Sequence, residues 1–309
     1  MTLEPGIAAL VQDFINAGRP SARHQPIEER RAGYIAAASL SGDSETRVSV
    51  EERTLQGRCL RIYSPLQVPS NVPAIVYYHG GCFVSGGFAT HDNTLRQLAY
   101  HSQCRVIAVQ YRLAPEHRYP AAHDDAFQTF GVIQKQAKTL QIDAANLVLM
   151  GDSAGGHLAF ITTLRLRDRG GLQPRGQVLI YPMLDATARC DTYRTHGDDF
   201  IITRDTLLTG YEAYFAPSEY RHPEASPLWR HDLNDLPQTL IITAEYDPLR
   251  DEGEQLYRTL VETGVSARCK RYLGVIHGFF QLGGISQAAR DVMQDIASNV
   301  RQMVNTEED

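Results

Sequence analysis

One serine in the sequence stands in a setting that favours nucleophilic chemistry, the stretch Gly151–Gly155 (Gly-Asp-Ser-Ala-Gly). An apolar run at residues 147–150 precedes it and a helical pattern follows, which is the strand-turn-helix context of a nucleophile elbow. The two glycines suit a turn too tight for side chains, and the serine hydroxyl then projects at the carboxyl edge of a sheet. The pattern therefore predicts Ser153 as a nucleophile.

A serine hydroxyl is a weak nucleophile near neutral pH, so it needs a base, and an acid must orient that base. Of the eleven histidines, His277 lies in a glycine-flanked loop after the last expected strand, residues 267–272. Asp247 follows another expected strand, residues 240–244, also at a carboxyl edge. The chain order Ser153, Asp247, His277 is the order of an α/β-hydrolase triad.

Three other residues compete for these roles. His157 follows Ser153 by four residues, which places it one turn down the next helix, so we interpret it as a structural residue. Asp251 and Glu252 are alternatives to Asp247, but their position suits the first turn of a helix, where acidic side chains are favourable. We prefer Asp247 as the acid.

A glycine-rich stretch, His79–Phe83, directly follows an expected strand at residues 74–78. Small residues let backbone N–H groups approach a substrate oxygen, so the stretch predicts an oxyanion hole together with the amide after the nucleophile. A phosphate-binding loop is the alternative. A Walker loop needs Gly-Lys-Ser/Thr after Gly86, where the chain has Gly87 and Phe88, and no Gly-x-Gly-x-x-Gly fingerprint follows a strand.

The elements that must position these residues alternate along the chain. Short apolar runs, typical of strands covered on both faces, are separated by helix-length segments. The expected strands are residues 74–78, 106–109, 147–150, 178–181 and 240–244, and the expected helices are residues 121–140, 154–167, 252–263 and 286–303. Period-two patterns on either side of Gln56 and Gly57 predict an antiparallel pair. The pattern predicts an α/β fold with a mostly parallel central sheet and helices on both faces.

Two segments lie outside this alternation. The first fifty residues contain two helical patterns, broken at residues 18–20. Almost sixty residues after Pro182 lack a central-strand pattern, which is typical of an insertion with its own helices that acts as a lid. The expected organisation is an N-terminal cap segment (1–45), a first catalytic part (46–184), a cap insertion (185–225) and a second catalytic part (226–309).

Composition limits the function classes. The 309 residues carry a formal net charge of −6 without a Lys/Arg-rich tract, which argues against nucleic acid or an anionic membrane as the main partner. No window is apolar enough for a membrane span, and no basic stretch with an apolar core opens the chain as a secretory signal does. Five unpatterned cysteines suit free thiols, so we expect a cytoplasmic protein.

Six motifs together resemble the hormone-sensitive-lipase family of α/β-hydrolases, most of all its bacterial carboxylesterases and acetyl esterases. They are His79-Gly80-Gly81, Tyr111–Glu116, Gly151–Gly156, Ser226–Leu228, Asp247–Gly253 and His277–Phe279, in the family's order. The resemblance implies a helical cap, the triad named above, and an oxyanion hole made by the amides of Gly81, Cys82 and Ala154. It also implies that His79 and Gly80 support this loop and that no metal or organic cofactor is needed.

One position departs from the family, which usually has a third glycine where this chain has Cys82. An oxyanion hole uses the amide, so catalysis is expected to survive if the backbone there tolerates a Cβ atom. We interpret Cys82 as a tolerated small residue; the alternative is a thiol that makes the site sensitive to thiol reagents.

The resemblance implies hydrolysis of a small-molecule ester with a short- to medium-length acyl chain. Candidates for the pocket wall are Phe83, Phe200, Tyr214, Phe215 and Phe279, for which ordinary core packing is the alternative. Amide, carbamate or lactone hydrolysis and acyl transfer would use the same residues. A non-catalytic ligand receptor of this fold is disfavoured because Ser153, Asp247 and His277 are all present. The sequence leaves a homodimer open.

Overall fold

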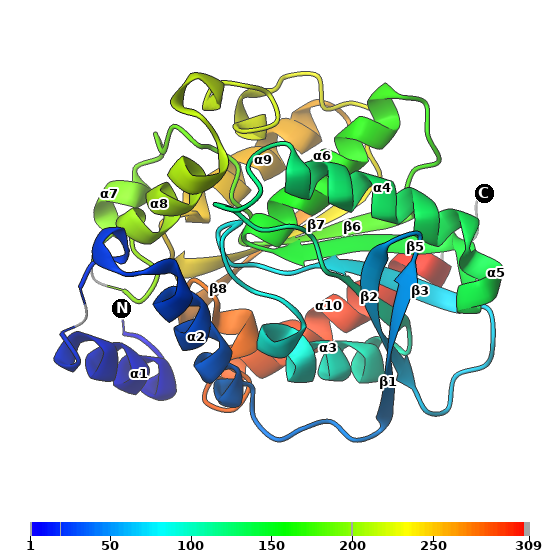
Figure 1. Ribbon diagram of the computed structural model, residues 1–309, viewed down its shortest axis with the longest axis horizontal. Helices are drawn as coiled ribbons and strands as arrows, with labels where there is room; N and C mark the ends of the chain where they lie inside the picture. The colour runs from blue at the N-terminus through cyan, green and yellow to red at the C-terminus, as the bar shows by residue number, and fades with distance from the viewer. Residues whose placement is uncertain (1, 19, 199, 306–309) are drawn as a thin grey trace.

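The computed structural model describes residues 2–18, 20–198 and 200–305 and contains one eight-stranded sheet (Figure 1). The strands are β1 (Val48–Leu55), β2 (Arg58–Pro65), β3 (Val72–Tyr78), β4 (Arg105–Val109), β5 (Ile142–Asp152), β6 (Gly176–Ile180), β7 (Gln238–Tyr246) and β8 (Ala267–Ile276). Their order in the sheet is β1-β2-β4-β3-β5-β6-β7-β8. The pairs β1–β2 and β2–β4 are antiparallel and all other pairs are parallel, which confirms the expected α/β class and the hairpin.

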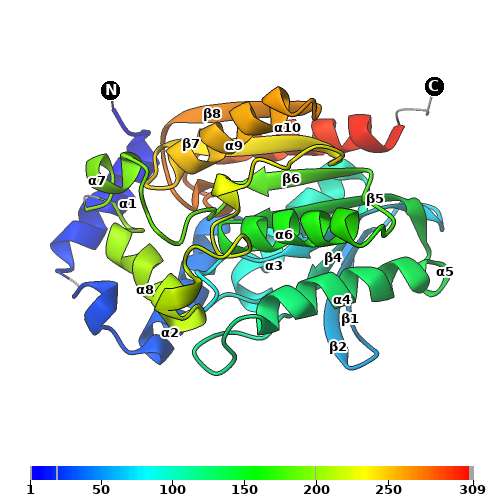
Figure 2. The ribbon, with the colours of Figure 1, turned by 90° about the horizontal axis from the view of Figure 1, so that it is seen from above.

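Helices cover both faces of the sheet (Figure 2). The α-helices are α1 (Pro5–Asn16), α2 (Ile27–Ala37), α3 (Phe88–Ser102), α4 (Ala121–Lys135), α5 (Ala137–Leu140), α6 (Ala154–Asp168), α7 (Thr192–Thr195), α8 (Arg204–Tyr214), α9 (Arg250–Glu262) and α10 (Gln287–Asn305). Short 3₁₀ turns are η1 (Ala22–His24), η2 (Ala38–Ser41), η3 (Pro217–Glu219), η4 (Pro227–Trp229) and η5 (Phe279–Gln281). Helices α4, α6 and α9 lie on one face, and α3 and α10 on the other.

The period of the strands explains the two apolar cores. Side chains of a strand alternate between faces, so Val76 and Leu149 enter the core under α4 and α6. Their neighbours Ile75 and Val148 enter the core under α3 and α10. Both faces of the central strands are therefore buried, which is why these strands are continuous apolar runs in the sequence.

The structure corrects three details of the expected elements. Helix α3 was not expected, because several of its polar residues, His91 and Thr94 among them, are buried and obscure the apolar stripe. The helix expected over residues 121–140 ends at Lys135, and the separate α5 follows it. Strand β8 continues beyond residue 272 to Ile276, so residue 277 directly follows a strand.

Two segments distant in the sequence meet beside the carboxyl ends of the parallel strands, where α1 and α2 lie near α7 and α8 (Figure 1). The guanidinium of Arg23 donates two hydrogen bonds to Glu212, at 2.9 and 3.0 Å, and one to Asp205. Ser21 also donates to Asp205 at 2.6 Å, and Arg30 donates to Thr209 at 3.1 Å. These contacts join the N-terminal segment to the segment that follows β6.

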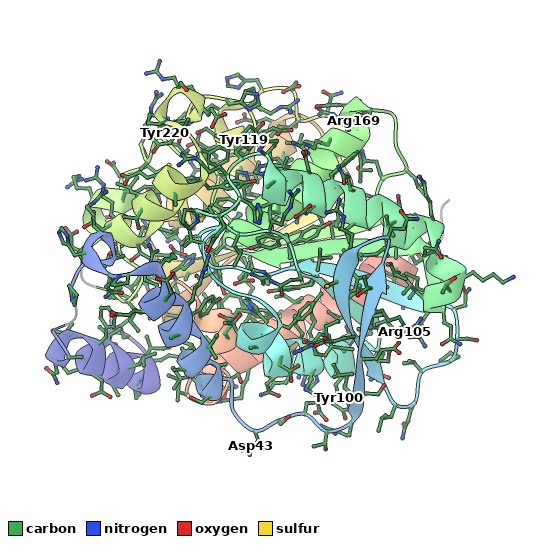
Figure 3. The ribbon with its side chains drawn as sticks, viewed as in Figure 1. Asp43, Tyr100, Arg105, Tyr119, Arg169 and Tyr220 are labelled. Carbon is green, nitrogen blue, oxygen red and sulfur yellow. The ribbon has the colours of Figure 1, made fainter. Side chains whose placement is uncertain are left out.

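Side chains fill the space between α4 and the residues after α8, with Tyr119 among them (Figure 3). The Tyr119 hydroxyl donates to Glu224 at 2.8 Å, and its ring packs on Phe215. Arg165 of α6 forms an ion pair with the same glutamate at 2.6 Å. The segment after α8 is therefore held to the residues just before α4 and to α6.

Among the described helices, none is long and apolar enough to cross a membrane.

Candidate active site

Ser153 occupies the turn between β5 and α6 with φ 55° and ψ −118°, a backbone conformation that costs energy for a residue with a Cβ atom. The flanking glycines make this turn sterically feasible. A Cβ atom at Gly155 would lie 1.8 Å from the carbonyl oxygen of Tyr78, and one at Gly151 would lie 2.3 Å from the carbonyl carbon of Gly155. Only glycine fits at either position, as the motif predicted.

The structure brings the three predicted triad side chains together. The Nε2 atom of His277 lies 3.1 Å from the Oγ atom of Ser153, and its Nδ1 atom lies 2.9 Å from Oδ2 of Asp247. The other carboxylate oxygen of Asp247 accepts the amide N–H of Leu249 at 2.8 Å. With Nδ1–H donating to a fully buried carboxylate, Nε2 is free to accept the serine proton.

The loop after β3 presents unused amides beside the serine turn. Val84 and Ser85 both donate to the carbonyl of Gly81, which turns the loop back on itself. Among the described residues, the amides of Gly81 and Cys82 have no acceptor. Ala154 is the first residue of α6, where a helix amide has no intrahelical partner. The three amides predicted for an oxyanion hole are therefore free to donate.

Cys82 adopts φ 54°, in the left-handed region, so the loop accommodates a residue with a Cβ atom where glycine is usual. The side chain is buried, and burial raises the pKa of the Cys82 thiol to about 11. The thiolate that reacts with thiol reagents is thus disfavoured. This favours the interpretation of a tolerated small residue.

Asp152 links the serine turn to this loop. Its buried carboxylate accepts the amide of Gly80 at 2.8 Å and the hydroxyl of Tyr77 at 2.7 Å, and His91 Nε2 lies 3.1 Å away. Burial would raise the pKa of Asp152, but His91 and the hydrogen bonds outweigh it and hold that pKa below its usual value. Sequence reasoning missed this role, although Asp152 is inside the serine motif itself.

His79 lies in the same network. Its ring stacks on Tyr111 with centroids 4.2 Å apart, and Nδ1 lies 2.9 Å from the carbonyl oxygen of Gly80. Burial lowers the pKa of His79 to about 3, so the imidazole is neutral near neutral pH. These contacts fit the expected support of the loop.

Helix α2 contacts the loop from the N-terminal side. Arg31 donates to the carbonyl oxygen of Val84 at 2.8 Å and to that of Ala114 at 3.1 Å. The same guanidinium forms a two-pronged ion pair with Glu116 at 2.7 Å. Its hydrogen bonds connect the N-terminal segment directly to the loop that carries the free amides. The sequence motif at residues 111–116 is therefore a structural support for this loop.

The rival residues lie elsewhere. His157 is fully buried, and its ring contacts the carbonyl oxygens of Met183 at 2.7 Å and Glu224 at 2.8 Å, which agrees with a structural role. Asp251 pairs with Arg250 at 3.2 Å. Glu252 is in the first turn of α9 as expected, but it is fully buried rather than an exposed charge.

The residues suggested for the pocket wall occupy packed positions. Phe83 stacks on Tyr214 with centroids 4.6 Å apart, and Phe215 packs edge-on against Tyr214 at 4.7 Å; all three are fully buried. Phe279, at the start of η5, is fully buried and packs on Tyr272 with ring centroids 5.3 Å apart. Phe200 packs on Tyr246 at 5.3 Å and is partly exposed. Four of the five thus belong to the buried apolar clusters, and their place in a pocket wall stays a prediction.

Tyr181 is a further neighbour of the triad that the sequence did not single out. It follows β6 with φ 35°, is fully buried, and its ring centroid lies 4.5 Å from that of His277. Bulky residues rarely adopt a positive φ, and such strain clusters at functional sites. No sequence pattern signals this conformation.

Comparison with known proteins agrees with the fold. A family model described as an alpha/beta hydrolase fold matches residues 75–281. Ethyl acetate hydrolase of Pseudomonas putida is 33% identical over 98% of this chain and 99% of its own length. Carboxylesterase NlhH of Mycobacterium tuberculosis is 34% identical over 86% of this chain and 79% of its own.

The chain belongs to the hormone-sensitive-lipase family of α/β-hydrolases. Solved esterases share its entire fold. The hyperthermophilic esterase from the archaeon Pyrobaculum calidifontis superimposes with a TM-score of 0.91 at 35% identity, covering 98% of this chain and 99% of its own. An ester hydrolase from the Lake Arreo metagenome gives 0.93 at 33% identity, covering 99% and 100%. This family member is a carboxylesterase.

Proposed function

We propose that this carboxylesterase hydrolyses short- to medium-chain acyl esters, with Ser153 as nucleophile, His277 as general base and acid, and Asp247 as the acid that orients the histidine. The observation that carries the proposal is the unbroken contact from Ser153 Oγ through the imidazole to Asp247, at 3.1 and 2.9 Å. The three residues follow the carboxyl ends of three different strands of one sheet, so the sheet fixes their relative positions.

The reaction would proceed in two acyl-transfer steps. Ser153 Oγ attacks the ester carbonyl carbon while His277 Nε2 takes the hydroxyl proton. The amides of Gly81, Cys82 and Ala154 donate to the negative oxygen of the tetrahedral intermediate, each worth about 3–4 kcal/mol of barrier. His277 returns the proton to the leaving alkoxide, and the acyl-enzyme forms. Water, deprotonated by the same imidazole, then releases the carboxylic acid and restores the serine hydroxyl.

The substrate range rests on two supports. One relative is named for ethyl acetate, an ester with a two-carbon acyl group. The site is also closely covered, since Ser153 is 3% exposed and His277 is 8% exposed. A covered site of this kind favours short acyl groups over long chains.

We propose that the cap consists of residues 1–45 and 185–225. The Arg23–Glu212 pair and the Ser21–Asp205 hydrogen bond join these segments beside the strand ends. Arg31 and Arg30 extend the connection to the oxyanion loop and to α8. We also propose that the protein is cytoplasmic, because all five cysteines are free thiols.

The test is a rate profile across p-nitrophenyl esters of increasing acyl length, for wild type and Ser153→Ala. We expect the highest kcat/KM at two to eight carbons and loss of acyl-enzyme formation in the variant, with unchanged thermal unfolding. Matched anilide, carbamate and lactone substrates test the competing bond types. Full activity of Ser153→Ala would refute the triad, and a preference for an anilide over its ester would refute the substrate class.

A further inference from the structure

Glu252 is a buried acid that the proposed mechanism does not use. It lies in the first turn of α9 and is fully buried. Its Oε2 atom accepts the amide N–H groups of Leu184 and Asp185, the latter at 3.1 Å. Among the described residues, none meets Oε1 in good hydrogen-bonding geometry, and the hydroxyl of Tyr193 faces the carboxyl group. An acid in the first turn of a helix is usually a solvated charge, so its burial here calls for a physical reason.

The surroundings of Glu252 favour the neutral, protonated acid. The carboxyl group forms no ion pair with a described arginine or lysine, and the charge that acts most strongly on it is the buried carboxylate of Asp185. Burial, and then Asp185, raise the pKa of Glu252 well above its ordinary value, and they outweigh the hydrogen bonds from Tyr193 and the two amides, which lower it. Asp185 itself is well satisfied, because it accepts from the backbone and hydroxyl of Thr187 and from Ser226.

The two amides held by Glu252 belong to the chain that supports the serine turn. They follow β6 immediately after Met183, whose amide donates to the carbonyl of Ser153 at 3.2 Å. The carbonyl oxygen of Met183 lies 2.7 Å from the ring of His157, in α6. Residues 183–185 therefore lie between the serine turn, which Met183 contacts, and the first turn of α9, where Glu252 accepts the amides of Leu184 and Asp185.

Glu252 is also close in the chain to the proposed triad acid. Asp247 accepts the amide of Leu249 on its side chain and the amide of Arg250 on its carbonyl. The amide of Glu252 in turn donates to the carbonyl of Leu249 at 3.1 Å. Glu252 is thus the side chain that bonds the turn of Asp247 to the chain beneath Ser153.

We propose that Glu252 is a positioning residue that fixes the turn bearing Asp247 relative to the turn bearing Ser153. The inference rests on the proposed roles of those two residues. Two hydrogen bonds from rigid backbone amides hold the distance between the turns, and His277 spans the gap only when that distance is right. A neutral acid performs this task without placing a second negative charge beside Asp185.

The first test separates positioning from general stability. Glu252→Ala removes both hydrogen bonds, whereas Glu252→Gln keeps an oxygen that accepts them. Glu254→Ala is the matched control: it is two residues along the same helix and removes a two-pronged pair with Arg271, at 2.7 and 2.6 Å, away from the serine turn. Each enzyme is titrated with a phosphonate ester so that kcat refers to competent sites.

We expect kcat of Glu252→Ala to fall about ten- to a hundredfold with KM little changed, since a displacement of about 1 Å can cost that much. Glutamine should restore most of the loss, and Glu254→Ala should match wild type in kcat. Wild-type kcat per titrated site in Glu252→Ala would overturn the proposal. Failure of the proposed triad would be seen separately, as activity in Ser153→Ala.

The second test asks whether folded Glu252 is protonated, and it does not require the alanine variant to fold. The unfolded chain gives up the Glu252 proton above about pH 4.5, whereas the folded protein keeps it, so rising pH destabilises wild type relative to Glu252→Gln. The titratable groups facing Glu252 are Asp185, Tyr193, Tyr211 and Cys190, with Asp251 beside it on α9; all are shared by both proteins.

Urea unfolding is measured for both proteins from pH 5 to pH 8. We expect the ratio of their unfolding constants to change by about tenfold per pH unit in favour of the glutamine variant, the signature of one proton, until the folded wild type also loses that proton. A ratio independent of pH would show that folded Glu252 is ionised, and it would overturn the proposal.

Discussion

Replacing Gly155 with alanine should damage the enzyme far more than its small size suggests. The added Cβ atom would lie 1.8 Å from the carbonyl oxygen of Tyr78, 2.5 Å from its carbonyl carbon and 2.7 Å from the carbonyl oxygen of His79. Ordinary contacts begin near 3.4 Å, and all three neighbours are backbone atoms, so no side chain can rotate away. The end of β3 and the start of α6 must separate by more than 1 Å.

That separation acts on stability and on catalysis together. Overpacking of a close-packed interior costs about 1–3 kcal/mol of unfolding free energy. Tyr78 and His79 lead directly into the loop of Gly81, so the free amides move with them, and a shift of about 1 Å can lower kcat about a hundredfold. We therefore expect Gly155→Ala to lose both stability and turnover.

Gly131 provides the matched control, because it is a helical glycine in α4 where an added Cβ atom would meet no neighbour within 4 Å. Alanine there should raise the unfolding free energy by about 0.5–1 kcal/mol through its higher helix propensity. Urea unfolding and kcat with p-nitrophenyl acetate, per titrated site, would be measured for both variants. If Gly155→Ala matched Gly131→Ala in both quantities, the steric reasoning would be refuted.

Two further substitutions and one thiol reagent test other parts of the site. Arg31→Gln should lower kcat with a modest change in stability, because its two hydrogen bonds to loop carbonyls are lost. Arg23→Gln is the control: it removes a similar ion pair between the N-terminal segment and α8 and should leave kcat unchanged. Equal effects of the two substitutions on kcat would contradict the role of Arg31 in supporting the loop. Asp247→Asn should lower kcat on the order of 10³–10⁴-fold because the imidazole loses its orientation, and a kcat within tenfold of wild type would speak against it. Iodoacetamide at neutral pH should modify Cys82 slowly, since burial raises the pKa of its thiol; rapid inactivation that Cys82→Ser abolishes would show an exposed thiolate.

The sequence was most informative where one physical factor dominates. Continuous apolar runs identify strands buried on both faces, and the tight serine turn restricts its flanks to glycine, so β3, β5 and the position of Ser153 were predictable. Helix α3 was not, since buried polar side chains such as His91 mimic a solvated surface. The last part of β8 was missed because it contains Gly274, which has a φ of 72° and is typical of a loop rather than a strand.

The candidate site shows the same limit. Motifs placed Ser153, Asp247 and His277 at strand ends, and the structure brings their side chains within hydrogen-bonding distance; their catalytic roles remain predictions. The sequence could not show that Phe83 belongs to a buried aromatic stack, because an aromatic side chain after a strand suits a pocket equally well. It also could not show that Glu252 is buried, since the carboxyl's partners are amides of a distant segment.

The hydrogen bonds between α2 and the loop after β3 couple the proposed cap to the proposed oxyanion hole. Arg31 donates to the carbonyl oxygens of Val84 and Ala114, so a movement of α2 away from this loop breaks both hydrogen bonds. The amides of Gly81 and Cys82 would then be held less firmly. We therefore expect variants selected for larger substrates by loosening α2 to lose turnover, whereas substitutions in α8 that leave Arg31 in place should keep it.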